Sequence, residues 1–403
     1  MSAPMLRLQE PGVPDEPRGF ALWALGFRPF YLLAAALAVL ALPLWVLQLS
    51  GWVSTGALLR GATWHAHEMV FGYALAVVIG FLFTAGRNWS GQPTPCGRAL
   101  MLLAALWLAA RVLLWTPWAL AAALCNVAVP WLAAWGLWRA LHAGDNRRNY
   151  FFVALLMAMG VAAGAVHLMQ ARPDLPVATL LRGLGLPLAL DVLVFMIAVM
   201  AGRVVPMFSN NGVPGLQARR DPRLERLALA SLLALMALDA LGWGGAPLVA
   251  VLALAALAHL ARWLLWQPWG TLRQPLVWVL HAAYAWLPIH LVLRAGAALG
   301  WIAPGPATHA LTVGLLGLIT LGMITRTARG HTGRPLRAGR AETLAFLALL
   351  GAALLRVFLP LLQPSALLLS AQLSAVLWSL AFALYLWRYT PWLWRVRADG
   401  RPG

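Results

Sequence analysis

Two histidines and a carboxylate open one of the long apolar runs of this sequence, in the stretch Trp64-His65-Ala66-His67-Glu68-Met69-Val70-Phe71-Gly72. Ionisable side chains inside a bilayer cost at least about 2.5–3.5 kcal/mol each, so they usually face a protein interior and bind an ion, a cofactor or a proton. In a regular helix His65, Glu68 and Gly72 share one face, whereas His67 is turned by about 200° from His65. Either the run begins irregularly and the two imidazoles converge, or they serve different sites. A plainer alternative places both histidines among lipid headgroups.

The elements that position these residues are expected to be membrane helices. Of the 403 residues, 62% are hydrophobic and only 10% are charged, whereas soluble domains average about 25% charged residues. Apolar runs long enough to cross a bilayer lie near 29–49, 67–86, 98–115, 118–140, 150–171, 183–205, 225–242, 245–266, 275–299, 306–326, 342–361 and 365–389. The sequence therefore predicts an all-α polytopic membrane helix bundle of about twelve transmembrane helices. Residues 1–28 form an N-terminal tail, 29–390 a single transmembrane domain and 391–403 a C-terminal tail.

The basic residues indicate the orientation of this bundle. All 30 are arginine, and most lie at the two ends of the chain and in alternate connections. Because arginine is enriched in cytoplasmic loops, both termini are expected in the cytoplasm. Arg87, Arg203 and Arg326 follow the second, sixth and tenth runs, a weak indication of three four-helix units. The net charge of +18 thus reflects orientation, and no nucleic-acid-binding motif accompanies it.

In this orientation the histidines fall into layers. The outer layer contains His65, His67, His167 and His309, and His290 lies roughly 13 Å deeper than the outer end of its run. His259 and His281 form an inner layer on two neighbouring antiparallel runs, where they could meet. Tyr284 lies one turn from His281 and could donate a proton there. His142 and His331 belong to the cytoplasmic rim.

Imidazole is the commonest side-chain ligand for haem iron, copper and zinc. Cys96 and Cys125 are too far apart for a CxxC motif, so nothing indicates an iron–sulfur cluster, a thiolate zinc site or c-type haem. Isolated buried histidines are more often structural, which is the expectation for His142, His167 and His290. The groups His65/His67/His309 and His259/His281 are instead predicted to bind a metal or haem.

Carboxylates suggest a rival function. Besides Glu68, the apolar runs contain Asp191 and Asp239. Proton-driven transporters carry such groups near the membrane midplane, often on broken helices, and Pro43 and Pro187 are candidates for such breaks. A secondary transporter of a small molecule is therefore an alternative, although Asp191 paired with a nearby Arg or hydroxyl is as plausible.

Several strings resemble those of the NnrS family of bacterial membrane proteins. They are Gly26-Phe27-Arg28-Pro29-Phe30, the stretch Trp64–Gly72, Gly80-Phe81-Leu82 through Asn88-Trp89, Arg203 with Pro206 and Phe208, Leu280-His281 with Tyr284, His309-Ala310-Leu311-Thr312-Val313-Gly314, Met323 with Thr325-Arg326, and Gly330-His331-Thr332-Gly333-Arg334-Pro335. Together they span nearly the whole chain.

The resemblance implies a multi-pass bacterial inner-membrane protein that binds haem b and copper and acts in the nitric oxide response, linked to nitrosative stress and denitrification. Nitric oxide and a redox partner would be its partners besides the lipid bilayer. Carried over by motif position, the polar residues of interest are His65, His67, Glu68, His281, Tyr284, His309 and His331.

On this basis His67 and His309 are the preferred axial pair for haem, and His65 and His281 are candidates for copper or a second haem. His331 is a further candidate metal ligand, and Glu68 and Tyr284 are candidate catalytic groups of an NO-handling oxidoreductase. Arg111, Arg182 or Arg294 could neutralise the haem propionates. A non-enzymatic scaffold for denitrification proteins is the remaining alternative.

Overall fold

The computed structural model describes residues 19–54 and 56–400, and their regular structure is helical. The helices are α1 (Phe27–Leu49), α2 (Gly61–His67), η1 (Glu68–Ala74), α3 (Leu75–Ser90), α4 (Gly97–Leu113), α5 (Ala119–Ala143), η2 (Arg147–Asn149), α6 (Phe151–Ala171), α7 (Ala178–Leu184), α8 (Leu186–Gly212), α9 (Pro222–Ala240), α10 (Gly245–Leu265), η3 (Pro268–Thr271), α11 (Pro275–Ala298), α12 (Pro304–His309), η4 (Ala310–Gly317), α13 (Leu318–His331), α14 (Arg340–Leu362), η5 (Pro364–Ala366) and α15 (Leu367–Trp394). Extended pairing within this part of the chain is limited to one bridge, between Phe20 and Arg395.

Each predicted apolar run coincides with a helix. Ten helical segments of the described chain are long and apolar enough to cross a membrane. The shorter α4 and the less apolar α9 complete the twelve predicted runs. Large apolar side chains such as Leu102, Trp135 and Leu257 are exposed on the outer surface, as expected for contact with lipid. The polytopic helical bundle is thus confirmed, and the protein is a multi-pass membrane protein.

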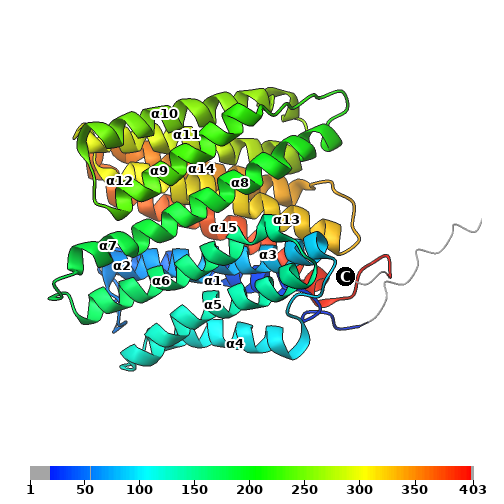
Figure 1. Ribbon diagram of the computed structural model, residues 1–403, viewed down its shortest axis with the longest axis horizontal. Coiled ribbons are helices and arrows are strands. Elements are labelled where there is room, and N and C mark those ends of the chain that lie inside the picture. The colour runs from blue at the N-terminus through cyan, green and yellow to red at the C-terminus, as the bar shows by residue number, and fades with distance from the viewer. Residues whose placement is uncertain (1–18, 55, 401–403) are drawn as a thin grey trace, which may run out of the picture.

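The two ends of the described chain lie together at one end of the bundle (Figure 1). The backbone N–H of Ala21 donates to Trp394, and the Arg28 guanidinium donates to the carbonyls of Leu393, at 3.0 Å, and Arg395, at 2.6 Å. Helix α1 begins at Phe27 and α15 continues to Trp394, so the helical domain extends slightly beyond the predicted 29–390. Of the predicted N-terminal tail, 1–28, the first 18 residues lie outside the described part of the chain.

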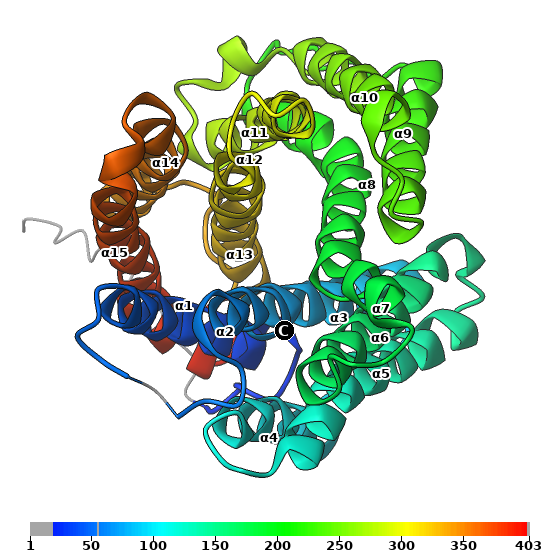
Figure 2. The ribbon, with the colours of Figure 1, turned by 90° about the vertical axis from the view of Figure 1, so that its left-hand side faces the viewer.

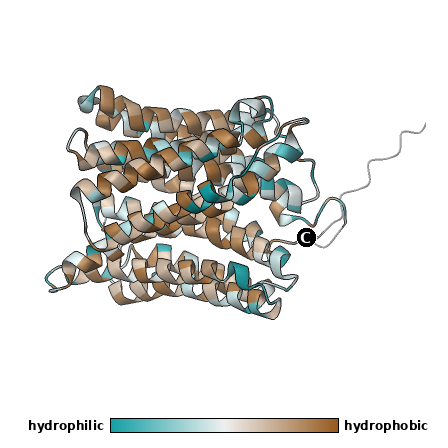
Figure 3. Cartoon of the chain, turned by 45° about the horizontal axis from the view of Figure 1, so that its top comes forward, coloured by the Kyte–Doolittle hydropathy of each residue, from teal (hydrophilic) through white to brown (hydrophobic). Residues whose placement is uncertain are grey.

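Seen along the helices, α13 occupies the middle of the bundle (Figure 2). Helices α14 and α15 lie on one side of it and α8 on the other, while α1 and α3 pass below it in this view. Hydrophobic residues extend along the helices, and hydrophilic residues gather mainly at the end that contains the C-terminus (Figure 3). This asymmetry agrees with the arginine pattern of the sequence.

The helix irregularities differ from those predicted. Pro43 lies inside the continuous helix α1, and Pro187 lies in the first turn of α8, where its missing N–H breaks no intrahelical bond. The predicted break at Pro43 is therefore wrong, whereas a helix break does lie beside Pro187, between the end of α7 at Leu184 and the start of α8 at Leu186. Irregular backbone also occurs as π-helix in η1 and η4, directly after His67 and His309. π-Helical turns are rare and frequently lie at functional sites.

Candidate functional site

A cavity of about 600 Å³ lies at the end of the bundle opposite the termini. Residues of α1, α2, η1, α8, α9, α11, α12, η4, α14 and α15 form its wall. Most of the wall is apolar, and the ionisable side chains on it are His65, Asp191, Asp239, His290, Arg294, His309 and Arg356. An apolar pocket of this size with a few convergent polar groups is typical of a ligand site.

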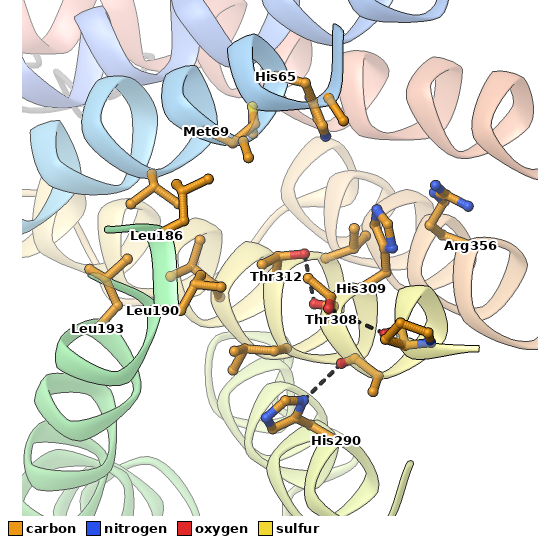
Figure 4. Close-up of a pocket in the computed structure, with 18 of the residues that line it drawn as sticks. His65, Met69, Leu186, Leu190, Leu193, His290, Thr308, His309, Thr312 and Arg356 are labelled. Atoms are coloured by element: carbon orange, nitrogen blue, oxygen red, sulfur yellow. Dashed lines mark hydrogen bonds between the residues drawn. The ribbon is translucent and has the colours of Figure 1, made fainter. Parts of the chain in front are cut away.

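His65 enters the cavity from α2, near the first π-helical segment (Figure 4). Its ring stacks on Trp45 of α1 with a centroid separation of 5.1 Å and an interplanar angle of 7°. Its buried Nδ1 has no hydrogen-bond partner within the described chain. A buried polar atom without a hydrogen bond lowers stability by about 1–3 kcal/mol. The stacking on Trp45 therefore holds this imidazole in a position where its Nδ1 forms no hydrogen bond. Such a ring is available to a ligand.

His309 enters the same cavity from α12, at the start of the second π-helical segment (Figure 4). Its Nδ1 lies 2.7 Å from the carbonyl oxygen of Gly305. Since a carbonyl only accepts, Nδ1 carries the proton and Nε2 keeps its lone pair. His290 is arranged similarly, with Nδ1 2.8 Å from the carbonyl oxygen of Ala307. The backbone of α12 thus fixes the tautomer of both rings.

The charged residues on the cavity wall differ in pairing. Arg294 forms an ion pair with Asp239, and Asp191 lies on the wall beside them. Arg356 donates to the Ser370 hydroxyl at 3.2 Å and has no carboxylate partner within the described residues. A guanidinium without a carboxylate partner on a cavity wall is suited to an anionic group of a ligand.

His67 points into a separate, closed network. Its side chain is fully buried, and Nδ1 lies 3.0 Å from a Glu68 carboxylate oxygen. The same oxygen accepts from Arg111 at 2.7 Å, and the other arm of Arg111 donates to Asn126. The ring of His167 on α6 meets that of His67 at a centroid distance of 5.2 Å and an angle of 85°. The two histidines of the Trp64–Gly72 stretch therefore serve different sites, the second of the two predicted possibilities.

The inner histidines are hydrogen-bonded within the helix bundle. The Tyr284 hydroxyl lies 2.6 Å from His259 Nδ1 and accepts from Arg262 at 2.8 Å, while His259 Nε2 donates to the Ala228 carbonyl at 3.1 Å. His281 instead bonds to the Ser209 hydroxyl through Nε2, at 2.7 Å. The sequence had suggested that Tyr284 acts on His281. In the structure Tyr284 bonds to His259 instead. Within the inner layer, each imidazole has a hydrogen-bond partner of its own.

The family model for NnrS protein matches residues 21–397, nearly the whole chain. The chain belongs to the NnrS family. A search of curated proteins found no match. The protein is thus a membrane protein of the family that the sequence analysis associated with the nitric oxide response, and all four of its outer histidines fall within the matched region.

The NnrS fold brings some of the predicted site residues together and separates others. His65 and His309 share the outer cavity, whereas His67 does not line it. Of the preferred pair, His309 therefore lines the cavity and His67 does not. His281 belongs to the inner layer, and His331 lies at the end that holds the termini, with its ring 5.6 Å from that of Phe27. Within the described residues, no three His, Cys, Asp or Glu side chains form a metal-binding group.

Two functional candidates of this NnrS chain escaped the sequence analysis. Arg356 lines the cavity, whereas Arg111 and Arg294, which were predicted to neutralise propionates, are paired with Glu68 and Asp239. Arg182 does not line the cavity. His167 was expected to be structural, yet it faces His67. The position of Arg356 and of His167 inside apolar runs was the signal that could have identified them. Their surroundings, however, are formed by helices distant in the sequence.

Proposed function

We propose that this NnrS protein binds haem b in the outer cavity, with His65 and His309 as the residues that hold the iron, and that it acts in the nitric oxide response of the bacterial inner membrane. One observation carries the proposal. Two imidazoles from different spans, each next to a π-helical segment, line one largely apolar cavity of about 600 Å³. Imidazole is a common axial ligand of haem iron.

The residues present fit such a group. The hydrogen bond from His309 Nδ1 to Gly305 leaves Nε2 as a ligand atom, as in other metal-binding histidines. His65 Nδ1 has no partner within the described chain, and Trp45 holds the ring by stacking. Arg356 can pair with a propionate, while apolar residues such as Leu186 and Leu311 form the rest of the wall. These residues bind and orient the group and exclude water from it.

When bound, ferrous haem supplies a site for nitric oxide and a one-electron carrier. Copper is the second proposed metal, at imidazoles outside the cavity. The proposed activity is accordingly the binding or redox handling of nitric oxide, with both termini in the cytoplasm, as the arginine distribution favours.

The haem content of the purified protein tests this proposal. Wild-type protein is expected to show a Soret band and close to one haem b per chain, and both His65→Ala and His309→Ala are expected to lose most of it. His142→Ala is the matched control, because His142 is exposed and lies outside the cavity. Colourless wild-type protein, or unchanged haem in both cavity variants, would contradict the proposal. A scaffold would in addition keep its cellular phenotype in these variants.

Proton-coupled transport of a small molecule is the second candidate, because Asp191, Asp239 and Arg294 line the same cavity. An ionisable cluster that opens onto a cavity inside a membrane protein suits a proton or substrate site. Asp191→Asn separates the two functions. Under the haem proposal this variant keeps its haem and its protection against nitric oxide, whereas a transporter would lose substrate flux.

A further inference from the structure

A smaller cavity, with a volume of about 80 Å³, lies among α1, α3, α6, α8 and α13. Of these helices, α3, α8 and α13 are seen in Figure 2. Three methionines, Met196, Met200 and Met323, belong to its wall. Protein interiors are close-packed, and the flexible methionine side chain usually fills irregular gaps. Three of them surround this space without filling it, which indicates a site for a guest molecule.

The wall of this cavity offers few hydrogen bonds. Among the described residues that form it, none carries a charge, and the hydroxyl groups belong to Tyr31 and Thr320. The Thr320 hydroxyl donates to the Leu316 carbonyl at 2.6 Å and accepts from Tyr73, so it is already engaged. A buried water typically forms about three hydrogen bonds, which the Tyr31 hydroxyl alone does not provide. The cavity therefore favours an apolar guest over water.

The volume of the cavity limits the size of that guest. A dry cavity of about 150 Å³ lined by apolar side chains binds one benzene molecule or xenon. At about 80 Å³, this cavity has room for only a few heavy atoms. Haem or a lipid chain is therefore too large, whereas a diatomic gas fits. Because apolar solutes favour an apolar environment over water, a cavity inside a membrane protein meets such gases at a raised concentration.

The smaller cavity lies directly inward of the outer cavity, along the same helices. On α8, Leu193 lines the outer cavity and Met196 lines the smaller one. Three residues of an α-helix correspond to about 4.5 Å along its axis, which is less than one turn. Leu316 of η4 and Ile319 of α13 have the same relation to the two cavities. The two cavities are therefore close neighbours.

Tyr73 of η1 stands between the two cavities. Val70, three residues before it, lines the outer cavity, and Val77, four residues after it, lines the smaller one. The Tyr73 ring packs edge-on against Trp378 of the outer wall, with a centroid distance of 5.5 Å. Its hydroxyl bonds to Thr320 of the inner wall. One buried side chain thus contacts both walls and forms a partition between the two spaces.

We propose that the smaller cavity binds an apolar diatomic gas, which passes by Tyr73 into the outer cavity. The inference deepens the proposed function and rests on it only in taking nitric oxide as the gas and haem as its destination. Binding in the chamber involves no covalent bond to the protein and no electron transfer. The chamber holds the gas beside the cavity in which it is bound by the iron.

Xenon, an apolar atom, tests the chamber in crystals of the full-length protein under xenon pressure. An anomalous-scattering peak is expected beside Met196, Met200 and Met323 in the wild type. The peak is expected to be lost in Ala201→Leu, because Ala201 is buried in the cavity wall and the longer side chain fills the space. Ala154→Leu, at an exposed alanine of α6 that lines neither cavity, is the matched control and should keep the peak. No peak in the wild type, ordered waters in the cavity, or an undiminished peak in Ala201→Leu would overturn the inference.

Carbon monoxide rebinding to the haem after flash photolysis provides a second readout in detergent solution. Ala201→Leu is expected to slow bimolecular rebinding several-fold, and Ala154→Leu to leave its rate unchanged. Tyr73→Phe, which frees the ring from Thr320, is expected to speed it. Equal rates in all three variants would overturn passage of the gas through the chamber.

The two proposals fail separately. A xenon peak in protein that binds no haem supports the chamber and refutes only the haem proposal. Haem-loaded protein without a xenon peak refutes only the chamber.

Discussion

The outer and inner halves of this bundle use buried histidines in different ways. In the outer half, His65, His67 and His167 each keep a buried ring nitrogen without a partner in the described chain. In the inner half, His259 uses both nitrogens, toward Tyr284 and Ala228. His281 is intermediate, because Nε2 bonds to Ser209 while Nδ1 has no partner there. Burial is thus common to both halves, and the outer half differs in that three of its histidines leave a nitrogen unpaired beside a cavity or a second imidazole.

The largest effect is expected from Arg111, the cation of the outer network. Arg111→Met leaves Glu68 buried without its ion pair, and breaking a buried pair on one side costs about 3–5 kcal/mol. Thermal unfolding in detergent measures the loss. Arg172→Met, at an exposed arginine, is the control and should unfold as wild type does. Equal stability of the two variants would show that Glu68 and Arg111 are not coupled in the folded protein.

A smaller effect is expected from Tyr284 in the inner half. Tyr284→Phe removes the hydroxyl that bonds to His259 and Arg262, which should lower the free energy of unfolding by about 1–3 kcal/mol. Haem and copper contents should not change, because the comparison assigns the inner network a structural role. Loss of either cofactor in a folded Tyr284→Phe variant would return this tyrosine to the functional site.

Gly72 offers a finer test of the outer network. It lies in the π-helical segment η1, and an added methyl group would meet the side chains of Leu37 and Arg111. The nearest of these atoms is the flexible end of Leu37, so Gly72→Ala should cost about 1 kcal/mol. Gly305→Ala, where the methyl group meets open space, should be neutral. If the two variants melt at the same temperature, the close packing of Leu37 and Arg111 against this glycine does not limit the residue at position 72.

The smallest effect is expected at the exposed pair Arg172 and Asp174. The guanidinium of Arg172 donates two hydrogen bonds to Asp174 and holds the pKa of this carboxyl below its usual value. A carboxyl whose pKa is lower in the folded state stabilises the fold at pH values above its pKa in the unfolded state. This stabilisation is lost as the pH falls through its pKa in the folded state. Because the pair is fully exposed, Asp174→Asn should leave the unfolding midpoint unchanged from neutral pH to pH 5. A clear shift there would show that this loop is packed more tightly than its exposure indicates.

The sequence predicted the helices well because each span is a continuous apolar run whose length the bilayer dictates. It left open whether His65 and His67 converge or point to different sides, and only the second possibility followed from helical periodicity, which is local. It did not predict the π-helical segments after His67 and His309, which have no distinctive residue pattern. Nor did it predict that His67 contacts His167, or that Arg356 has no carboxylate partner among the described residues, because both depend on how distant parts of the chain pack together.

The central claim is that His65 and His309 hold haem iron across the outer cavity. Near-infrared magnetic circular dichroism of the oxidised protein identifies axial ligands directly. The account predicts two histidines in the wild type and a shift to histidine and methionine ligation in His65→Met, with no shift in His67→Met. An unchanged spectrum in His65→Met, or a shift in His67→Met instead, would contradict it.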